Sequence, residues 1–338
     1  MPLNLAIYGY DSDIGKLVIE YLDRSSLEFG SITPLTPLDG EFDAVRVKGR
    51  NYLISSINDF DFTGTDILLM LCPPDETERL GDFIGKLDCA VIDASGHRFG
   101  DREVPVVIPK LNPYVVGAGD DARIFSIANS LATQIALALS PLHDEFGIKR
   151  ANVNALVSVS ELGMLGTEGL ASESISLFNG NSPDNSPFAA QQAFNLINQI
   201  GIMIDDETEF EQTVTEQVGK VLEDFADKLS LYCIQVPIFY GHCIIVHVDL
   251  EESVKISDIK KCLGQCDYLK ICDDKQDLVT PVTHLQNEDR LLVSRLKTES
   301  YSSSSVSFMV FMDNARVGQA LSCIELIELM AKKLKKFA

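Results

Sequence analysis

The sequence predicts an α/β protein that combines a doubly wound parallel sheet with a second, α+β domain on a mostly antiparallel sheet. Three observations predict it. Short apolar runs alternate with helical patterns in the first third of the chain, a glycine turn follows the first run, and longer strands with sparse helices fill the second half. Alternating strands and helices are typical of parallel sheets, because each crossover helix covers one face of the sheet.

Length and composition limit the class of protein. The chain has 338 residues, of which 46% are hydrophobic, so we expect two domains with ample cores. The formal net charge of −22 opposes contact with a phosphate backbone, and we expect no nucleic-acid partner. No run approaches ~18 apolar residues. The N-terminus lacks the pattern of a signal peptide, so we expect a cytoplasmic protein with no membrane partner.

The first apolar run, residues 3–8, leads through the turn Gly9-Tyr10-Asp11-Ser12-Asp13-Ile14-Gly15 into a helical pattern. Strand, glycine turn and helix is the order that a dinucleotide fingerprint needs, so this part is typical of a Rossmann-type fold. Ser12 replaces the middle glycine, and two aspartates put negative charge where a phosphate would lie. The turn is therefore either a weak cofactor site or a turn without a ligand. The candidate cofactor-binding residues are Gly9, Asp11, Ser12, Asp13, Ile14 and Gly15.

Further elements complete the first domain. Strands are predicted at residues 67–71, 90–93 and 104–108, with a helix over residues 76–87. Pro105 places the last of these strands at a sheet edge, because proline cannot donate to the ladder. A final helix over residues 319–336 is expected to return to this domain. The predicted domains are residues 1–128 with 319–338, and residues 129–318.

The junction between the domains carries the main candidate residue. Residues 124–127 are typical of a strand end, and Asn129 and Ser130 precede a helical pattern that Pro141 is expected to end. Asn and Ser are preferred helix caps, which favours Ser130 as a cap. The alternative is a nucleophile, because the free N–H groups and positive end of a helix N-terminus stabilise an oxyanion.

The second domain is predicted from its strand patterns. Strands are expected at residues 151–159, 231–239, 243–248 and 307–312, with a helix over residues 215–229 and a long loop over residues 178–187. The spacing of Cys262, Cys266 and Cys272 is C-x3-C-x5-C without a nearby His, which predicts no metal site. In a cytoplasmic chain the eight cysteines are expected to be reduced.

Over nearly its whole length the sequence resembles the aspartate-semialdehyde dehydrogenases. The resemblance rests on the order and spacing of several short pieces: the turn at residues 9–15, residues 92–95, residues 104–113, Asn129-Ser130 with Gln134, residues 139–147, Val236-Pro237 with Gly241-His242, and Asp313-Asn314 with Gly318. It implies a homodimer that reductively dephosphorylates aspartyl phosphate with NADPH. In that reaction a Cys thiolate forms a thioester, a His moves protons, and Arg and Lys residues hold the carboxylate and phosphate. Asn314 joins the candidate cofactor-binding residues on the same ground.

The departures from the family pattern concern the reaction itself. By the resemblance Ser130 stands at the position of the nucleophilic Cys, while His242 matches the catalytic His. A thiol with a pKa of ~8.5 is a few per cent thiolate at neutral pH, whereas a serine hydroxyl needs a base in contact. Ser130 and His242 are the candidate catalytic residues, and no third, orienting residue is evident from the sequence.

The positions that hold the substrate also differ. Gln235 stands where the family has a carboxylate-binding Arg, which removes a bidentate, charge-assisted contact. Phe99 stands where a second Arg is expected, beside Arg98. Ser160 stands at the position of an active-site Gln and Thr213 at that of a phosphate-binding Lys. The candidate substrate-binding residues are therefore Gln235, Arg98 and Ser160. Residues 33–37 also lack the basic side chain that would bind the 2′-phosphate of NADP.

This set of departures resembles the Usg-type branch of the family, which carries Ser in place of Cys. The main hypothesis is a homodimeric paralogue that is non-catalytic or repurposed, with an unknown small-molecule ligand and doubtful binding of NADP. One alternative is an NAD(P)-dependent semialdehyde oxidoreductase on a different substrate. The other is a Ser–His acyl transferase or hydrolase.

Overall fold

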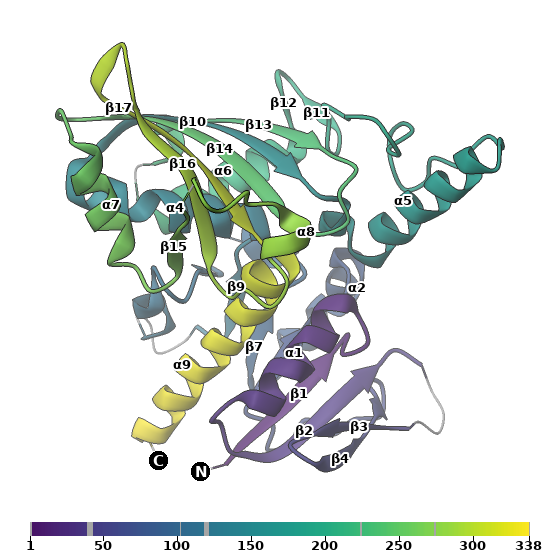
Figure 1. The fold of residues 1–338 in the computed structure, drawn as a ribbon. Helices are drawn as coiled ribbons and strands as arrows, with labels where there is room; N and C mark the ends of the chain where they lie inside the picture. The colour runs from purple at the N-terminus through teal and green to yellow at the C-terminus, as the bar shows by residue number, and fades with distance from the viewer. Residues whose placement is uncertain are drawn as a thin grey trace. The chain divides into compact units, whose positions relative to one another are not determined.

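The computed structural model describes residues 2–38, 43–101, 103–117, 122–223, 225–273 and 275–337. The chain forms two compact units (Figure 1). Unit 1 comprises Met1–Ala128 with Gln319–Ala338, and unit 2 comprises Asn129–Gly318.

Unit 1 is built on a parallel sheet, as the sequence predicts. Within the described residues seven strands lie in the order β5-β2-β1-β6-β7-β9-β8, and each neighbouring pair is parallel. The edge position of β8 confirms the expectation from Pro105. The strands are β1 (Leu3–Tyr8), β2 (Phe29–Thr36), β5 (Ser55–Ser56), β6 (Ile67–Met70), β7 (Ala90–Asp93), β8 (Val106–Val107) and β9 (Ile124–Ile127), with a separate hairpin of β3 (Ala44–Val47) and β4 (Arg50–Leu53).

Helices cover both faces of this sheet. Alternate residues of β1 enter different cores, since successive strand side chains point to opposite faces. Leu5 and Ile7 pack in the core that includes residues of α1 (Asp13–Arg24) and α9 (Ser322–Phe337). Ala6 packs in the second core, which includes residues of α3 (Gly81–Ile84) and Leu80.

The prediction of a single helix over residues 76–87 is wrong. This part of the chain forms two short helices, α2 (Pro74–Arg79) and α3, which begins at Gly81. A glycine inside a helix has more backbone entropy to lose than other residues, which weakens the helix at that point. Two short 3-10 helices, η1 (Arg98–Gly100) and η2 (Pro113–Gly117), follow later in the unit.

Unit 2 is built on a mixed sheet with mostly antiparallel neighbours. Within the described residues its six strands lie in the order β13-β10-β14-β17-β16-β15. The outer pairs β10–β13 and β15–β16 are parallel, and the three inner pairs are antiparallel. The strands are β10 (Ile148–Val157), β13 (Leu229–Gln235), β14 (His242–Leu250), β15 (Leu269–Ile271), β16 (Leu291–Glu299) and β17 (Ser302–Met312), with a small hairpin of β11 (Met203–Ile204) and β12 (Glu207–Thr208).

Helices α4 (Ser130–Phe146) and α6 (Glu209–Val221) pack against each other and against this sheet (Figure 1). The expectation that Pro141 ends α4 is wrong, because the helix continues to Phe146 and ends at Gly147, where φ is +65°. Residues 130–142 of α4 are all buried, so the free energy of packing offsets the loss of the backbone hydrogen bond that Pro141 cannot donate. The start expected for α6 is also wrong, because Thr208 and Glu211 form a capping box that begins the helix at Glu209.

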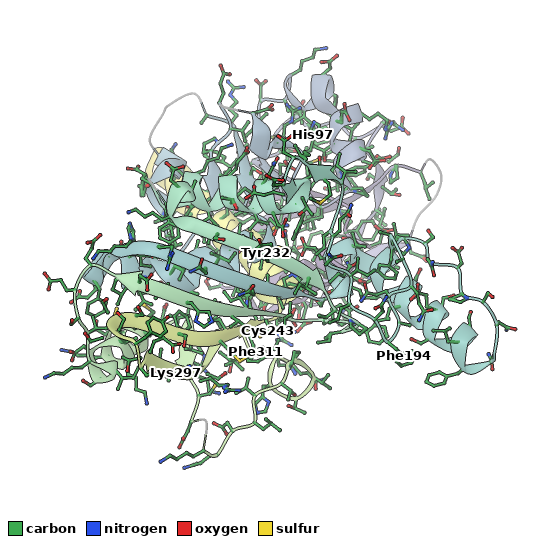
Figure 2. All side chains as sticks on the ribbon, turned by 90° about the horizontal axis from the view of Figure 1, so that it is seen from above. His97, Phe194, Tyr232, Cys243, Lys297 and Phe311 are labelled. Carbon is green, nitrogen blue, oxygen red and sulfur yellow. The ribbon has the colours of Figure 1, made fainter. Side chains whose placement is uncertain are left out.

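The opposite face of the sheet is partly covered. Figure 2 labels Tyr232, Cys243 and Phe311 on strands β13, β14 and β17. Leu285, which follows α8 (Pro281–His284), packs on Cys243 and Phe311, whereas Tyr232 is 67% exposed. The remaining helices of unit 2 are α5 (Gly163–Phe178), α7 (Ile256–Gly264) and the 3-10 helices η3 (Val159–Leu162) and η4 (Ala226–Lys228). Among the described residues, neither unit contains a helix with the length and hydropathy needed to span a membrane.

Candidate functional site

Ser130 is the first residue of α4 and lies in a closed polar cluster. The interpretation of Ser130 as the helix cap is wrong, because Asn129 is the cap and its Oδ1 accepts the Leu131 N–H at 2.8 Å. The Ser130 side chain, 1% exposed, instead donates its hydroxyl proton to Glu161 Oε2 at 2.8 Å. Gly318 packs on it so closely that a Cβ there would lie 2.7 Å from the Ser130 Cβ.

His242 begins β14 and faces Ser130. Its Nε2 lies 3.3 Å from Ser130 Oγ and 2.9 Å from Glu161 Oε2, and its side chain is fully buried. On the other side of the ring, Nδ1 accepts the backbone N–H of Ser158 at 3.2 Å. Ser158 Oγ lies 3.0 Å from the same nitrogen. An ionised carboxylate oxygen only accepts hydrogen bonds, so the contact with Glu161 Oε2 places a proton on Nε2.

Glu161 connects these side chains, and sequence reasoning did not find it. It lies in η3, just after the end of β10, and its Oε1 accepts the Asn129 amide N–H at 2.6 Å. Burial raises the pKa of the Glu161 carboxyl, but hydrogen bonds from His242, Asn129 and Ser130 and the attraction of His242 outweigh it, so this pKa lies below its ordinary value. The only sequence signal is its position directly after Ser160, which the resemblance already marks as an active-site position.

The positions of the protons decide which chemistry the cluster supports. The Ser130 hydroxyl and the His242 Nε2–H both donate to the same carboxylate oxygen, Glu161 Oε2. His242 Nε2 therefore has no free lone pair toward Ser130. A Ser–His acyl-transfer pair needs the reverse arrangement, with Nδ1–H held by a carboxylate and Nε2 free to accept the serine proton.

Ser160 and Asn314 lie next to this cluster and bond to each other. Asn314 Oδ1 accepts hydrogen bonds from Ser160 Oγ at 3.0 Å, Ser158 Oγ at 3.3 Å and the Gly241 N–H at 3.1 Å. Asn314 begins the π-helix η5 (Asn314–Leu321), so these bonds hold the end of β17 against the starts of η3 and β14. The amide oxygen of Asn314 is thus fully engaged inside unit 2.

Gln235 lies on the same sheet face as His242. It pairs with Val157 across β13 and β10, and continuing the antiparallel register of β10 and β14 places Val157 opposite His242. Two strand spacings separate Gln235 from His242 by about 10 Å. Gln235 is 3% exposed, and its Nε2 has no hydrogen-bond partner among the described residues. A buried amide donor is thus available where the resemblance expects an Arg.

Arg98 belongs to unit 1 and is held by its neighbours there. Its backbone N–H donates to Asp93 Oδ2 at 2.9 Å, and its Nη1 lies 3.2 Å from Asp101 Oδ2. The side chain of Phe99 lies outside the described residues. Arg98 is therefore anchored in η1 by two aspartates of its own unit.

The glycine turn of unit 1 is the candidate site for the pyrophosphate of NADP. Gly9, with φ of +86°, and Gly15 are required by the turn itself, since a Cβ would lie 2.7 Å from Leu71 C and 2.3 Å from Gly9 O, respectively. Ser12 Oγ accepts the Gly15 N–H at 3.0 Å and donates to Gly9 O at 2.7 Å. The Ser12 hydroxyl therefore occupies the Gly15 N–H, one of the donors in the first turn of α1 that a pyrophosphate would use. With carboxylates at Asp11 and Asp13 as well, the residues present do not fit a bound pyrophosphate.

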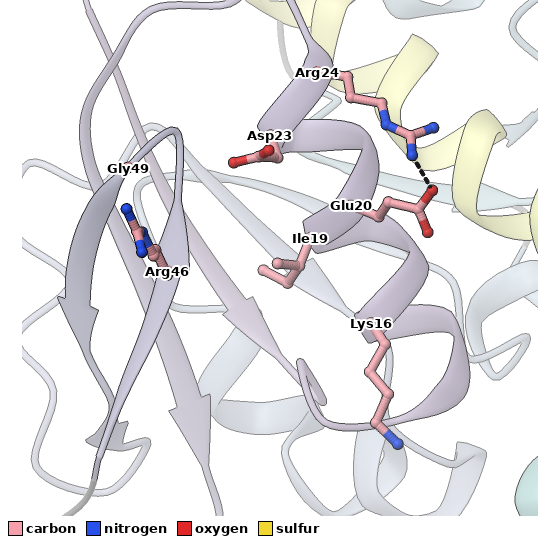
Figure 3. A pocket seen from close by; sticks show the side chains of 7 residues that line it. All are labelled: Lys16, Ile19, Glu20, Asp23, Arg24, Arg46 and Gly49. Atoms are coloured by element: carbon pink, nitrogen blue, oxygen red, sulfur yellow. Dashed lines mark ion pairs between the residues drawn. The ribbon is translucent and has the colours of Figure 1, made fainter.

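Unit 1 also contains an open pocket of about 550 Å³ beside α1 (Figure 3). The pocket is lined by both basic and acidic side chains. Among them Arg24 and Glu20 form an ion pair at 2.8 Å, so their charges cancel. These mixed charges do not define an anion site. Within the described ranges, no cluster of three or more His, Cys, Asp or Glu side chains is arranged to hold a metal ion.

Comparison with known proteins defines the class. The model of the semialdehyde dehydrogenase dimerisation domain matches residues 139–317, just over half of the chain. The chain therefore belongs to the semialdehyde dehydrogenase family.

Particular relatives cover nearly the whole chain. Aspartate-semialdehyde dehydrogenase 2 of Vibrio cholerae is 27% identical over 330 residues, 97% of this chain and 98% of the relative. A crystal structure of aspartate semialdehyde dehydrogenase II from Vibrio cholerae matches 98% of this chain and 99% of that one, with a TM-score of 0.91 at 27% identity. The USG-1 protein homolog of Azotobacter vinelandii is 26% identical over 335 residues, 98% of both chains. A Candida albicans aspartate semialdehyde dehydrogenase solved with NADP shares the fold, at 15% identity and a TM-score of 0.72 over 98% of this chain and 99% of that one.

Proposed function

We propose that this protein is a repurposed member of the family that does not catalyse the aspartyl-phosphate reaction. The observation that supports this is the commitment of both Ser130 O–H and His242 Nε2–H to Glu161 Oε2. The family reaction needs a thiolate nucleophile and a His that moves protons. The Glu161 carboxylate contacts both side chains. Its negative charge would disfavour a thiolate at position 130, and its hydrogen bond to His242 Nε2–H holds the proton that the His would have to move.

The test is phosphate-dependent NADPH formation from aspartate semialdehyde by the full-length protein. The Vibrio cholerae relative, assayed in parallel, serves as the positive control. We expect no activity from the wild type or from S130C, because Gln235 also lacks the charge of the expected Arg. Appreciable NADPH formation by either protein overturns the proposal.

We further propose that NADP is not bound tightly. This rests on the Ser12 cap and the two aspartates at the glycine turn. Titration of the protein into NADPH, followed by cofactor fluorescence, is expected to show no saturation up to millimolar concentration. Saturable binding at micromolar concentration favours the alternative of an oxidoreductase with a different substrate.

We propose a cytoplasmic homodimer. The match to a dimerisation domain supports the dimer, and the partly exposed sheet face around Tyr232 offers a surface for it. Light scattering after size exclusion measures the mass directly, and the value expected is twice the 37.2 kDa of one chain. A monomer mass at micromolar concentration contradicts this proposal.

A further inference from the structure

Ser130 lies beside a base that the sequence did not indicate. Its Oγ is 2.8 Å from Glu161 Oε2, within the distance needed for direct proton transfer. We propose that Ser130 is an acyl-accepting nucleophile with the Glu161 carboxylate as its general base, and that the site hydrolyses uncharged carboxylic esters. This inference rests on the proposed function in one respect, since it takes the aspartyl-phosphate reaction to be absent.

Glu161 rather than His242 is the base because of the tautomer of His242. Because Glu161 Oε2 accepts the Nε2–H, His242 Nε2 cannot also accept the Ser130 proton. His242 is therefore a positioning residue that fixes the carboxylate against Ser130. The same hydrogen bonds keep the pKa of Glu161 below its ordinary value, so Glu161 is an ionised carboxylate at neutral pH, with its Oε2 unprotonated beside the Ser130 hydroxyl.

The charges around Glu161 select an uncharged substrate. Asp313, at the end of β17, adds a second acidic group near His242, although burial raises the pKa of its carboxyl. Arg316 lies 3.6 Å (Nη1) from Asp289 Oδ1 and 3.4 Å (Nη2) from Asn287 Oδ1, and its charge also acts on Asp313. Burial raises the pKa of the Cys233 thiol on β13, and the charges of Glu211 and Glu161 raise it further. An anionic substrate would be repelled by the Glu161 carboxylate, whereas an ester carbonyl can accept a hydrogen bond from Gln235 Nε2, which has no partner among the described residues.

The reaction balances without a further reagent. Ser130 Oγ bonds to the acyl carbon while its proton passes to Glu161 Oε2. The positive end of the dipole of the 17-residue helix α4 stabilises the oxyanion, since the Leu131 N–H is already bonded to Asn129 Oδ1. The alcohol leaves as its C–O bond breaks and takes the proton from Glu161. Water then attacks the acyl-serine and gives a proton to Glu161, which returns it to Ser130 Oγ as the carboxylic acid departs. The carboxylic acid finally releases its proton to solvent.

The experiment measures modification of Ser130 in the full chain by a fluorophosphonate probe, mapped by peptide mass spectrometry, and hydrolysis of p-nitrophenyl acetate. We expect E161Q to slow both by at least ~100-fold, the scale of general base catalysis. H242Q keeps an N–H donor toward Glu161 but disturbs its positioning, so it is expected to slow both reactions less than E161Q does. S130A abolishes both, and the surface variant E168Q serves as the matched control because Glu168 is an exposed residue of the neighbouring helix α5.

The pH profile of the wild type provides a test that needs no variant. An ordinary imidazole base titrates near ~6.5, whereas an ordinary glutamate titrates near ~4.3. With Glu161 as base, the labelling rate stays level from pH 8 to pH 5. A fall centred near pH 6.5, no labelling of Ser130 in the wild type, or labelling unaffected by E161Q each overturns the inference. Failure here leaves the NADPH assay unaffected, so it is distinguishable from failure of the proposed function.

Discussion

Placing a thiol at position 130 tests the influence of Glu161 directly. S130C puts sulfur where Ser130 Oγ now lies, 2.8 Å from Glu161 Oε2. Two unit charges ~4 Å apart repel by about 4 kcal/mol at an effective dielectric constant of ~20. That energy corresponds to about 3 pKa units, so a thiol with an ordinary pKa of ~8.5 is expected to titrate above ~11.

The assay is alkylation by iodoacetamide, followed at the peptide that contains position 130 so that the native cysteines do not interfere. S130C/E161Q removes the carboxylate charge and keeps its shape. About 1000-fold more thiolate is then present at pH 7.5, but thiolate nucleophilicity falls with pKa at a Brønsted slope of ~0.45. The net acceleration expected from E161Q is about 40-fold.

S130C/E168Q is the matched control and should react as slowly as S130C. The reasoning is refuted if the thiol of S130C titrates below ~8, or if adding E161Q leaves its reactivity unchanged. Either result would mean that the carboxylate does not control the nucleophile position.

Three further predictions concern stability. E161A leaves the donors of Asn129, Ser130 and His242 without their acceptor, so the free energy of unfolding in urea is expected to fall by about 3 kcal/mol; a loss below ~1 kcal/mol contradicts this. Because folding lowers the pKa of Glu161, its stabilisation is present above the unfolded value of ~4.3 and is lost as pH falls through the lower folded value. The wild type should therefore lose stability more steeply than E161Q between pH 5 and pH 2, and parallel curves contradict this. In G15A the new Cβ would lie 2.3 Å from Gly9 O, so the free energy of unfolding should fall by about 2 kcal/mol or more. In G49A the new Cβ has no neighbour within 4 Å and only the φ of +76° opposes it, so the fall should be about 1 kcal/mol. Equal shifts in the melting temperatures of the two variants argue against the packing explanation.

The parallel sheet of unit 1 could be predicted because its signals are local. Runs such as residues 67–70 are apolar throughout, which is typical of strands buried on both faces. Element ends were less predictable, because tertiary packing decides them. Pro141 is a strong local signal for a helix end, yet burial of α4 overrides it. The start of α6 was missed although Thr208 and Glu211 form a recognisable capping box.

The candidate site shows a sharper limit. Family resemblance pointed to Ser130 and His242, and the structure places them 3.3 Å apart. Glu161 is 31 residues from Ser130 and 81 from His242 in the chain, so their contact depends on the fold. By composition, a single glutamate between Ser160 and Leu162 is most often a solvated residue. The proton on His242 Nε2 was equally hidden, since it depends on the contact with Glu161 that only the fold creates.

Ser130 and Glu161 are chemically matched to each other. A serine hydroxyl donates a proton to a carboxylate and lowers its energy, whereas a thiolate in the same place would add a second negative charge to a buried site. A change of the nucleophile alone therefore creates a conflict that the native pair does not have. Recovery of the family reaction requires removal of the Glu161 charge before the thiol is useful, and then a cation at Gln235 to hold the substrate carboxylate. We therefore expect S130C to be inactive and S130C/E161Q to gain thiol reactivity without gaining phosphate-dependent NADPH formation. The alkylation and NADPH assays, run on the same two variants, separate these two requirements.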